Sequence, residues 1–436
     1  MIFVSIFVLL IAALLGSASV VEGLETLFGA SKGTKPIVGR VSAGSTAEIS
    51  SMGCGTWSWG NKLLFDYDPS QDEGIYEAYR EVRNAGVTLF DTADSYGTGA
   101  LNGRAEILLG MFERRYLDEI GISAGDDNDK ENETPWWDFT GATSSAANNN
   151  NNYRPQQVAT KLAPYPWRVT PGNIVRAAEG SLRRLEQPKL SIAQLHWSTA
   201  EYQPFQERAL REGICDVYDK GLCDAVGVSN YGPKQLFSVA EKFREREVPL
   251  AIAQVQYSLM TFEAGKTMNE ACDEVDCRLI SYSPLCLGLL TGKYTLKETN
   301  RLPKSFARRQ LFKELLPGAQ VLIDTLEVVA QEYGKSTSQV AINWCMCKGT
   351  VPIPGGRTLA QAREVSKVFR FFRFVSVLVV GIHPSIHHSN VLTHFTSFFA
   401  LSINQSINQS INRTLVQRAG PFDLMLCWNW KRLHPR

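Results

Sequence analysis

Short apolar runs alternate with stretches of helical periodicity along most of this chain, and this alternation limits what the chain can fold into. The apolar runs centre near residues 52, 88, 158, 192, 225, 252, 280 and 351. Strands separated by helices of about 10–15 residues are typical of parallel βα units. Eight such units predict a (β/α)8 TIM barrel rather than an open doubly wound sheet. Apolar runs broken by small residues between 37 and 60 predict an N-terminal hairpin and then a first strand at 52–57.

Polar residues stand where these predicted strands end. Asp91 follows the run at 87–90, Lys161 the run at 158–160 and His196 the run at 192–195, while Tyr96 lies five residues after Asp91. The C-terminal ends of all strands in such a barrel converge on one face, where the active site lies, so we expect these side chains to meet. The later runs end in a further set of residues of this kind: Ser229, Asn230, Gln254, Tyr282, Gly355 and Gly356.

Composition excludes several classes of protein. The chain has 436 residues, of which 44% are hydrophobic and 20% charged, with a net charge of +1. These values are ordinary for a soluble globular protein, and they give no reason to expect nucleic acid or an anionic membrane as a partner. The nine cysteines include no CxxC pair. We therefore expect reduced, buried thiols, no disulfide framework and no metal site. The sequence indicates no oligomeric state.

The first 23 residues differ from the rest. Residues 1–21 carry no charge, residues 2–15 are almost wholly apolar, and Gly16-Ser17-Ala18-Ser19 supplies small residues suited to processing. This pattern resembles a signal peptide without the usual positive start, and it is short for a stable membrane span. Because the cysteines are unpaired, we expect a plastid reached through the secretory route, with the secretory pathway or the cytoplasm as alternatives. Residues 24–39 form a predicted linker.

Two segments depart from the barrel pattern, which we place at residues 40–369. Residues 121–152 are polar and of low complexity, with an asparagine run at 148–152, and we interpret them as a surface insertion between the second helix and the third strand. After residue 369 the sequence changes character, and Ser402-Ile403-Asn404-Gln405 recurs almost unchanged. We interpret residues 370–436 as a tail that is not an evolved part of the fold, such as a translated intron or an alternative exon.

The polar strand ends belong to longer motifs that resemble those of the aldo-keto reductase family. The resemblance spans roughly residues 50–365, and the segment at 55–73 is further similar to the plastid-type aldo-keto reductases of plants and algae. It implies a barrel that binds NADPH or NADP+ across its C-terminal face and reduces small aldehydes and ketones by direct hydride transfer. The motifs are DTADSYG at 91–97, ATK at 159–161, QLHW at 194–197, GVSN at 227–230, QVQYS at 254–258, YSPL at 282–285, GKY at 292–294 and IPG at 353–355.

The resemblance implies a catalytic tetrad of Asp91, Tyr96, Lys161 and His196, in which Tyr96 is the general acid. Hydride arriving at a carbonyl carbon leaves negative charge on the oxygen, which needs a proton. A free tyrosine, with a pKa of about 10, is a weak acid near neutral pH. We expect the Lys161 cation to lower the pKa of Tyr96, Asp91 to keep Lys161 charged, and His196 to donate a hydrogen bond to the substrate oxygen.

The resemblance also implies where the cofactor lies. Ser229, Asn230 and Gln254 would hold the nicotinamide carboxamide, and Tyr282 would stack beneath the ring. Arg357 would face the 2′-phosphate, which favours NADPH over NADH. No GxGxxG follows the first strand, so the dinucleotide would bind without a Rossmann fingerprint. The complete set of expected cofactor contacts is Thr56, Trp57, Asp91, Ser229, Asn230, Gln254, Tyr282, Ser283, Pro284, Leu285, Gly288, Lys293, Gly355, Arg357, Gln361 and Glu364.

The sequence departs from the family pattern in two places, and two other functions stay open. Val365 stands where the family has an asparagine at the adenine end, and the C-terminal helices and substrate loop expected after residue 365 do not resemble the tail. One alternative is a regulatory or redox-sensing subunit that binds NADPH with little turnover. The other is an inactive product with an aberrant C-terminus.

Overall fold

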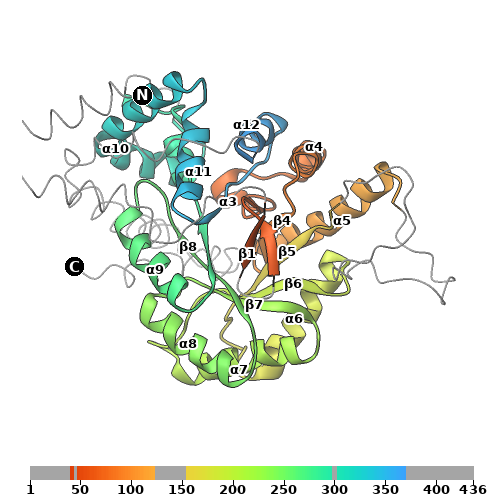
Figure 1. Ribbon diagram of the computed structural model, residues 1–436. Coiled ribbons are helices and arrows are strands. Elements are labelled where there is room, and N and C mark those ends of the chain that lie inside the picture. The colour runs from red at the N-terminus through yellow and green to blue at the C-terminus, as the bar shows by residue number, and fades with distance from the viewer. Residues whose placement is uncertain (1–39, 44–46, 123–153, 297–301, 370–436) are drawn as a thin grey trace, which may run out of the picture.

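The computed structural model describes residues 40–43, 47–122, 154–296 and 302–369. Within these residues, parallel strands form a barrel surrounded by helices (Figure 1). The strands follow one another in chain order around an eight-stranded sheet. The predicted barrel is confirmed, with strands β3 (Cys54–Gly55), β4 (Leu89–Ala93), β5 (Gln157–Leu162), β6 (Leu190–Leu195), β7 (Cys223–Ser229), β8 (Leu250–Gln256), β9 (Arg278–Tyr282) and β10 (Val351–Ile353).

The barrel closes where β3 meets β10. The amide of Gly53 donates to Pro352 O at 3.0 Å, and the amide of Gly55 donates to Pro354 O at 3.1 Å. A Cβ atom at position 55 would lie 3.0 Å from Ile353 O, so glycine allows the two backbones to approach this closely. β3 has two residues rather than the predicted six, because regular pairing with β4 is limited to Cys54 and Gly55.

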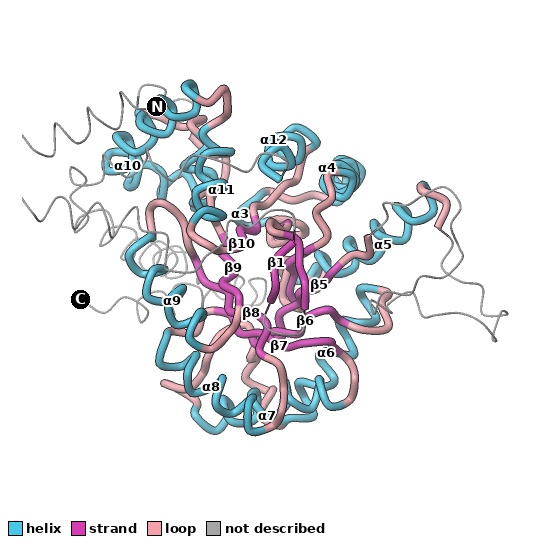
Figure 2. The backbone as a smooth tube through the Cα atoms, in the orientation of Figure 1, coloured by secondary structure: helices cyan, strands magenta, loops and turns pink. Residues whose placement is uncertain are grey.

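Helices cover the outside of the barrel (Figure 2). In α4, apolar side chains recur at helical spacing and are buried, among them Ile75, Tyr79 and Val82. The helix α6 begins with a capping box, in which Asn173 Oδ1 accepts from the amide and the hydroxyl of Thr170. The helices are α3 (Lys62–Phe65), α4 (Asp72–Asn84), α5 (Arg104–Glu119), α6 (Pro171–Leu185), α7 (Pro204–Asp219), α8 (Pro233–Glu245), α9 (Phe262–Glu274), α10 (Phe306–Glu332), α11 (Thr337–Cys347) and α12 (Leu359–Phe369), with short 3-10 turns η1 (Pro69–Gln71), η2 (Gly99–Leu101) and η3 (Cys286–Thr291).

The predicted hairpin is present and packs at the N-terminal end of the barrel. β1 (Arg40–Ala43) pairs antiparallel with β2 (Ala47–Ser50). Ser50 Oγ accepts from the amides of Thr88 and Leu89 at 3.3 and 3.1 Å, where β4 begins. Ile49 is fully buried against the apolar residues inside the barrel, such as Leu89. The opposite, C-terminal end of the strands is therefore the open face.

Several predicted segments lie outside the described residues. These are the targeting segment 1–23, the linker 24–39, the insertion from residue 123 onward and the tail 370–436. Among the residues that the structure describes, no helix is both long and apolar enough to cross a membrane. The same residues contain no cluster of histidine, cysteine and carboxylate side chains that could hold a metal ion.

Candidate active site

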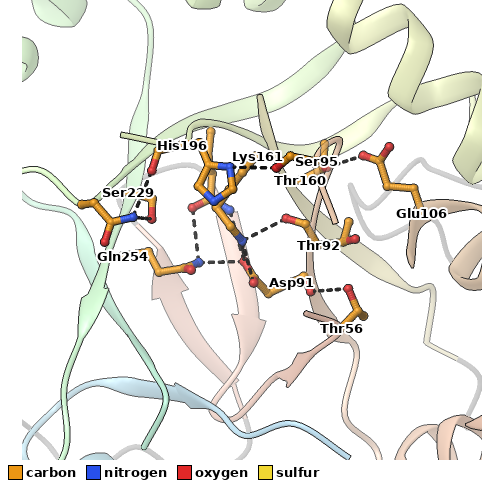
Figure 3. Close-up of polar contacts among 12 residues, drawn as sticks. Thr56, Asp91, Thr92, Ser95, Glu106, Thr160, Lys161, His196, Ser229 and Gln254 are labelled. Atoms are coloured by element: carbon orange, nitrogen blue, oxygen red, sulfur yellow. Dashed lines mark hydrogen bonds and ion pairs between the residues drawn. The ribbon is translucent and has the colours of Figure 1, made fainter. Parts of the chain in front are cut away.

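A buried ion pair lies at the C-terminal ends of β4 and β5 (Figure 3). Lys161 Nζ lies 2.6 Å from each carboxylate oxygen of Asp91 and donates to Thr92 O at 2.9 Å. The Lys161 side chain is 1% exposed and that of Asp91 is 4% exposed. Burial lowers the pKa of Lys161, and the Asp91 carboxylate opposes that shift. Removing either partner would leave an uncompensated charge in the barrel.

Two amide side chains complete the surroundings of Asp91. Gln254, at the end of β8, donates from Nε2 to Asp91 Oδ1 at 2.7 Å. Gln194, in β6, lies with its Nε2 3.5 Å from the same oxygen. Both glutamines are buried. Asp91 thus receives hydrogen bonds from across the barrel. Gln194 is one residue of this group that the sequence reasoning assigned no role.

Tyr96 lies on the loop after β4, next to this ion pair. Its side chain is buried, and Lys161 Nζ is 5.0 Å from the centre of its ring. The sequence predicted a lowered pKa, but the pKa of Tyr96 is raised well above its ordinary value, mainly by burial and further by the charge of Asp91. Because Asp91 offsets the charge of Lys161 at 2.6 Å, the cation does not compensate for burial. The phenol therefore stays protonated at neutral pH.

His196 follows β6 and is held neutral. Its pKa is well below the ordinary value because the ring is buried and because Lys161 and Arg168 are positively charged neighbours. Its ring centre is 5.9 Å from that of Tyr96, and its Nδ1 is 3.3 Å from Ser95 Oγ. The structure therefore brings the four predicted catalytic residues together at one end of the barrel.

A second pair of charged residues, Glu106 and Arg184, lies next to the strand that carries Lys161. Thr160, the neighbour of Lys161, donates its hydroxyl to the fully buried Glu106 (Figure 3). Glu106 also accepts from Arg184 Nε at 2.7 Å. Burial raises the pKa of Glu106, and the negative charge of Glu106 favours the charged form of Lys161. This layer links α5 and α6 to the strand that carries the lysine.

A chain of hydrogen bonds connects the ends of β6, β7 and β9. Asn230 donates from Nδ2 to His196 O at 3.1 Å and to Ser229 Oγ at 3.1 Å. Its Oδ1 accepts from the hydroxyl of Tyr282 at 2.9 Å. Asn230 has a positive φ of 57°, a conformation that asparagine tolerates better than most residues. The predicted carboxamide-binding residues and the predicted ring-stacking tyrosine are thus neighbours of His196.

The segment after β9 contains several residues in the left-handed backbone conformation. Ser283, Cys286, Leu287 and Gly288 have φ angles of 51°, 48°, 57° and 99°. The predicted contacts Ser283, Pro284, Leu285 and Gly288 all lie in this segment. Pro284 has no N–H, and the amides of Cys286 and Gly288 donate to Ser283 O and Leu285 O, each at 2.9 Å.

Two arginines meet beyond this loop, and the sequence predicted only one of them. The guanidinium carbons of Arg308 and Arg357 lie 5.5 and 5.4 Å from the ring centre of Phe65. Burial lowers the pKa of both arginines, and Arg308 lowers that of Arg357 further. Arg308 Nε is buried and has no hydrogen-bond partner among the described residues. Two adjacent cations with an orphaned donor fit a phosphate group.

Arg308 could not be identified from sequence because it belongs to no motif. Arg308 lies near the N-terminal end of α10. From sequence alone, an arginine at such a position is ordinarily interpreted as exposed to solvent. Its proximity to Arg357 depends on the packing of α10 beside α3, including a contact from Ser305 Oγ to Leu63 O at 3.4 Å.

The remaining predicted contacts lie at the edges of the site. Thr56 donates its hydroxyl to Asp91 O at 3.0 Å, so it also holds β3 on β4. Trp57 packs edge to face on Phe65, with ring centres 5.4 Å apart. Glu364 Oε1 accepts from Ser336 Oγ at 2.7 Å, a contact between α12 and the start of α11. Three predicted contacts, Lys293, Gly355 and Gln361, are exposed.

Known proteins resemble this chain in sequence and in fold. A profile described as the Aldo/keto reductase family matches residues 51–377. The chain is 46% identical over 319 residues to a pyridoxal reductase, chloroplastic, of Arabidopsis thaliana, covering 72% of this chain and 78% of that protein. It is 27% identical over 333 residues to the aldo-keto reductase YhdN of Bacillus subtilis, covering 74% of this chain and 85% of that protein.

Solved structures show the same fold. The glycerol dehydrogenase AKR11B4 of Gluconobacter oxydans superposes with a TM-score of 0.59 at 23% identity, covering 79% of this chain and 96% of that one. An aldo-keto reductase, AKR2E5, complexed with NADPH, superposes with a TM-score of 0.54 at 19% identity, covering 83% of this chain and 92% of that one. Since the family profile spans most of the chain, the resemblance seen in its motifs is confirmed: this protein is an oxidoreductase that belongs to the aldo/keto reductase family.

Proposed function

We propose that this protein reduces aldehydes and ketones to alcohols with NADPH, and that Tyr96 is the proton donor. The observation that carries the proposal is the buried group of Asp91, Lys161, Tyr96 and His196 at the open face of the barrel. Bound NADPH would supply the hydride. Side chains of this protein would donate the proton and polarise the substrate carbonyl.

In this proposal each side chain has a separate task. Tyr96 stays protonated because burial raises its pKa, so it carries the proton that the developing alkoxide needs. Once that proton has left, Lys161 stands 5.0 Å from the ring and stabilises the phenolate. Neutral His196 can donate one hydrogen bond to the substrate oxygen and polarise the carbonyl.

The proposed preference for NADPH over NADH rests on two positively charged side chains near the expected position of the 2′-phosphate. Residues 283–288, together with Lys293, would hold the pyrophosphate. Arg357, and with it Arg308, would bind the 2′-phosphate that distinguishes NADPH from NADH. Asn230, Ser229 and Gln254 would hold the carboxamide.

The similarity to a chloroplastic pyridoxal reductase supports two finer proposals. Pyridoxal, a planar aromatic aldehyde, is the first substrate to test. A plastid is the proposed location, to which residues 1–23 would direct the chain. A fluorescent reporter that carries residues 1–40 and remains in the cytosol of a plant or algal cell would contradict this location.

The test compares the full chain with Tyr96→Phe, using NADPH with pyridoxal or 4-nitrobenzaldehyde. General acid catalysis contributes typically about 10²–10⁴-fold, so we expect a loss of kcat of that order with unchanged NADPH affinity. Oxidation of NADPH is followed by its absorbance, and binding by the quenching of tryptophan fluorescence. Tight binding of NADPH without turnover by the unmodified chain would instead favour a redox-sensing subunit, and absence of binding would favour an inactive product.

A further inference from the structure

We propose that Ser95 is a positioning residue that sets the tautomer of His196: its hydroxyl donates a hydrogen bond to Nδ1 and thereby places the single ring N–H on Nε2. This inference rests on the proposed role of His196 as a donor to the substrate oxygen. Ser95 lies between two residues with other tasks, Asp94 and Tyr96.

The contact is enclosed and specific. Ser95 Oγ lies 3.3 Å from His196 Nδ1 (Figure 3). Ser95 is 3% exposed and His196 is 2% exposed, so water does not replace this contact readily. A serine hydroxyl can donate to an unprotonated ring nitrogen or accept from a protonated one, and the choice fixes which nitrogen carries the proton.

The choice matters because the ring is neutral. Burial and the nearby cations Lys161 and Arg168 hold the pKa of His196 well below its ordinary value. A neutral imidazole has only one N–H, whereas a charged one has two. Under the proposed function His196 donates to the substrate oxygen. With Nδ1 in contact with Ser95, the donating atom would be Nε2, which must then hold the proton. Ser95 must then be the donor to Nδ1.

The loop that carries Ser95 is anchored on both sides. Asp94 accepts from the amide of Ala163 at 3.1 Å and from Arg168 Nη1 at 2.5 Å. The amide of Tyr96 donates to Ala93 O at 3.1 Å, which closes a turn around Ser95. Because the neighbours of Ser95 are fixed, its hydroxyl is presented to the histidine in one position. The same turn therefore carries the proton donor and the group that orients its partner.

Nitrogen-15 NMR of the full chain labelled at histidine tests the tautomer directly. The resonances of His196 are identified by their loss in His196→Asn. We expect the Nε2–H tautomer at pH 7.5 in the unmodified chain, and a shift of population toward Nδ1–H in Ser95→Ala. An Nδ1–H tautomer in the unmodified chain would overturn the proposal without any measurement of activity.

Kinetics provide the second readout. Ser95→Ala removes one hydrogen bond, and we expect this loss to lower kcat about three- to tenfold. The KM for NADPH should not change. Ser95→Thr keeps the hydroxyl and should retain both the tautomer and most of kcat. Ser51→Ala is a matched control, because the Ser51 hydroxyl is also buried and has no hydrogen-bond partner in the described part of the chain. Equal kcat and an unchanged tautomer in Ser95→Ala would contradict the proposal, whereas an unmodified chain that has the Nε2–H tautomer but does not turn over would contradict only the proposed function.

Discussion

At the scale of single residues, His196 links the chemistry of the site to the stability of the protein. It is neutral in the folded chain because its pKa lies well below the ordinary value, but it binds a proton in the unfolded chain below about pH 6.5. The unfolded state then holds more protons than the folded state. The contribution of His196 to the free energy of unfolding is therefore lost as pH falls below about 6.5, at up to about 1.4 kcal/mol per pH unit.

His196→Asn should remove this part of the pH dependence. Urea unfolding followed at pH 7.5 and pH 5 measures the free energy of unfolding of both proteins at each pH. We expect the unmodified chain to lose more of that free energy on acidification than the variant does. An identical loss in the two proteins would mean that His196 is not held neutral by the fold.

The sequence was sufficient for residues whose role is local and insufficient for those that depend on packing. Asp91, Lys161 and His196 were predicted because each directly follows an apolar run in the sequence, and the barrel brings the C-terminal parts of its strands together. The pKa of Tyr96 was predicted in the wrong direction, since burial outweighs a cation whose charge Asp91 offsets. Arg308 was missed because only the packing of α10 beside α3 brings it to Phe65.

At the scale of elements, glycines decide how closely some of the outer helices pack. A Cβ atom on Gly110 of α5 would lie 2.6 Å from Leu185 O, at the end of α6. Backbone cannot move aside as a flexible side chain can, so Gly110→Ala should separate the two helices. Overpacking of this kind costs about 1–3 kcal/mol of unfolding free energy.

Gly74→Ala in α4 is the matched control. A Cβ atom there would meet nothing within 4 Å, so the substitution changes only helix propensity. Alanine is favoured over glycine inside a helix by up to about 1 kcal/mol. Urea unfolding should therefore show that Gly110→Ala destabilises the protein and Gly74→Ala stabilises it. A shift of the same sign in both variants would mean that the α5–α6 contact does not restrict position 110.

The boundaries of elements were predicted less well than their order. The alternation of apolar runs and helical stretches identified all eight barrel strands, because each run must be buried between helices and barrel interior. The first strand was predicted too long, since its extent depends on how β10 returns to close the barrel. That closure joins residues about 300 positions apart, such as Gly53 and Pro352, and no local pattern encodes it.

At the scale of the whole molecule, the proposed cofactor contacts come from strand ends all around the barrel. They include Thr56 after β3, Asn230 after β7 and Arg357 after β10, which is next to the seam where the barrel closes. A ligand that binds only the folded chain stabilises it by mass action, by about 2.7 kcal/mol at a concentration 100 times its Kd. NADPH should therefore raise the free energy of unfolding of the entire barrel in one transition.

Thermal unfolding with each cofactor can test why the protein would prefer NADPH to NADH. Arg357→Ala removes a guanidinium proposed to bind the 2′-phosphate, an interaction worth about 1.5–3 kcal/mol. At fixed cofactor concentration, we expect NADPH to raise the Tm of the variant less than it raises the Tm of the unmodified chain. NADH should raise Tm less than NADPH does, and by the same amount in both proteins. Arg363→Ala is the matched control, because Arg363 lies in the neighbouring helix α12 with its side chain 61% exposed. If Arg357→Ala reduced the effects of NADPH and NADH equally, Arg357 would support the fold of this region rather than recognise the phosphate.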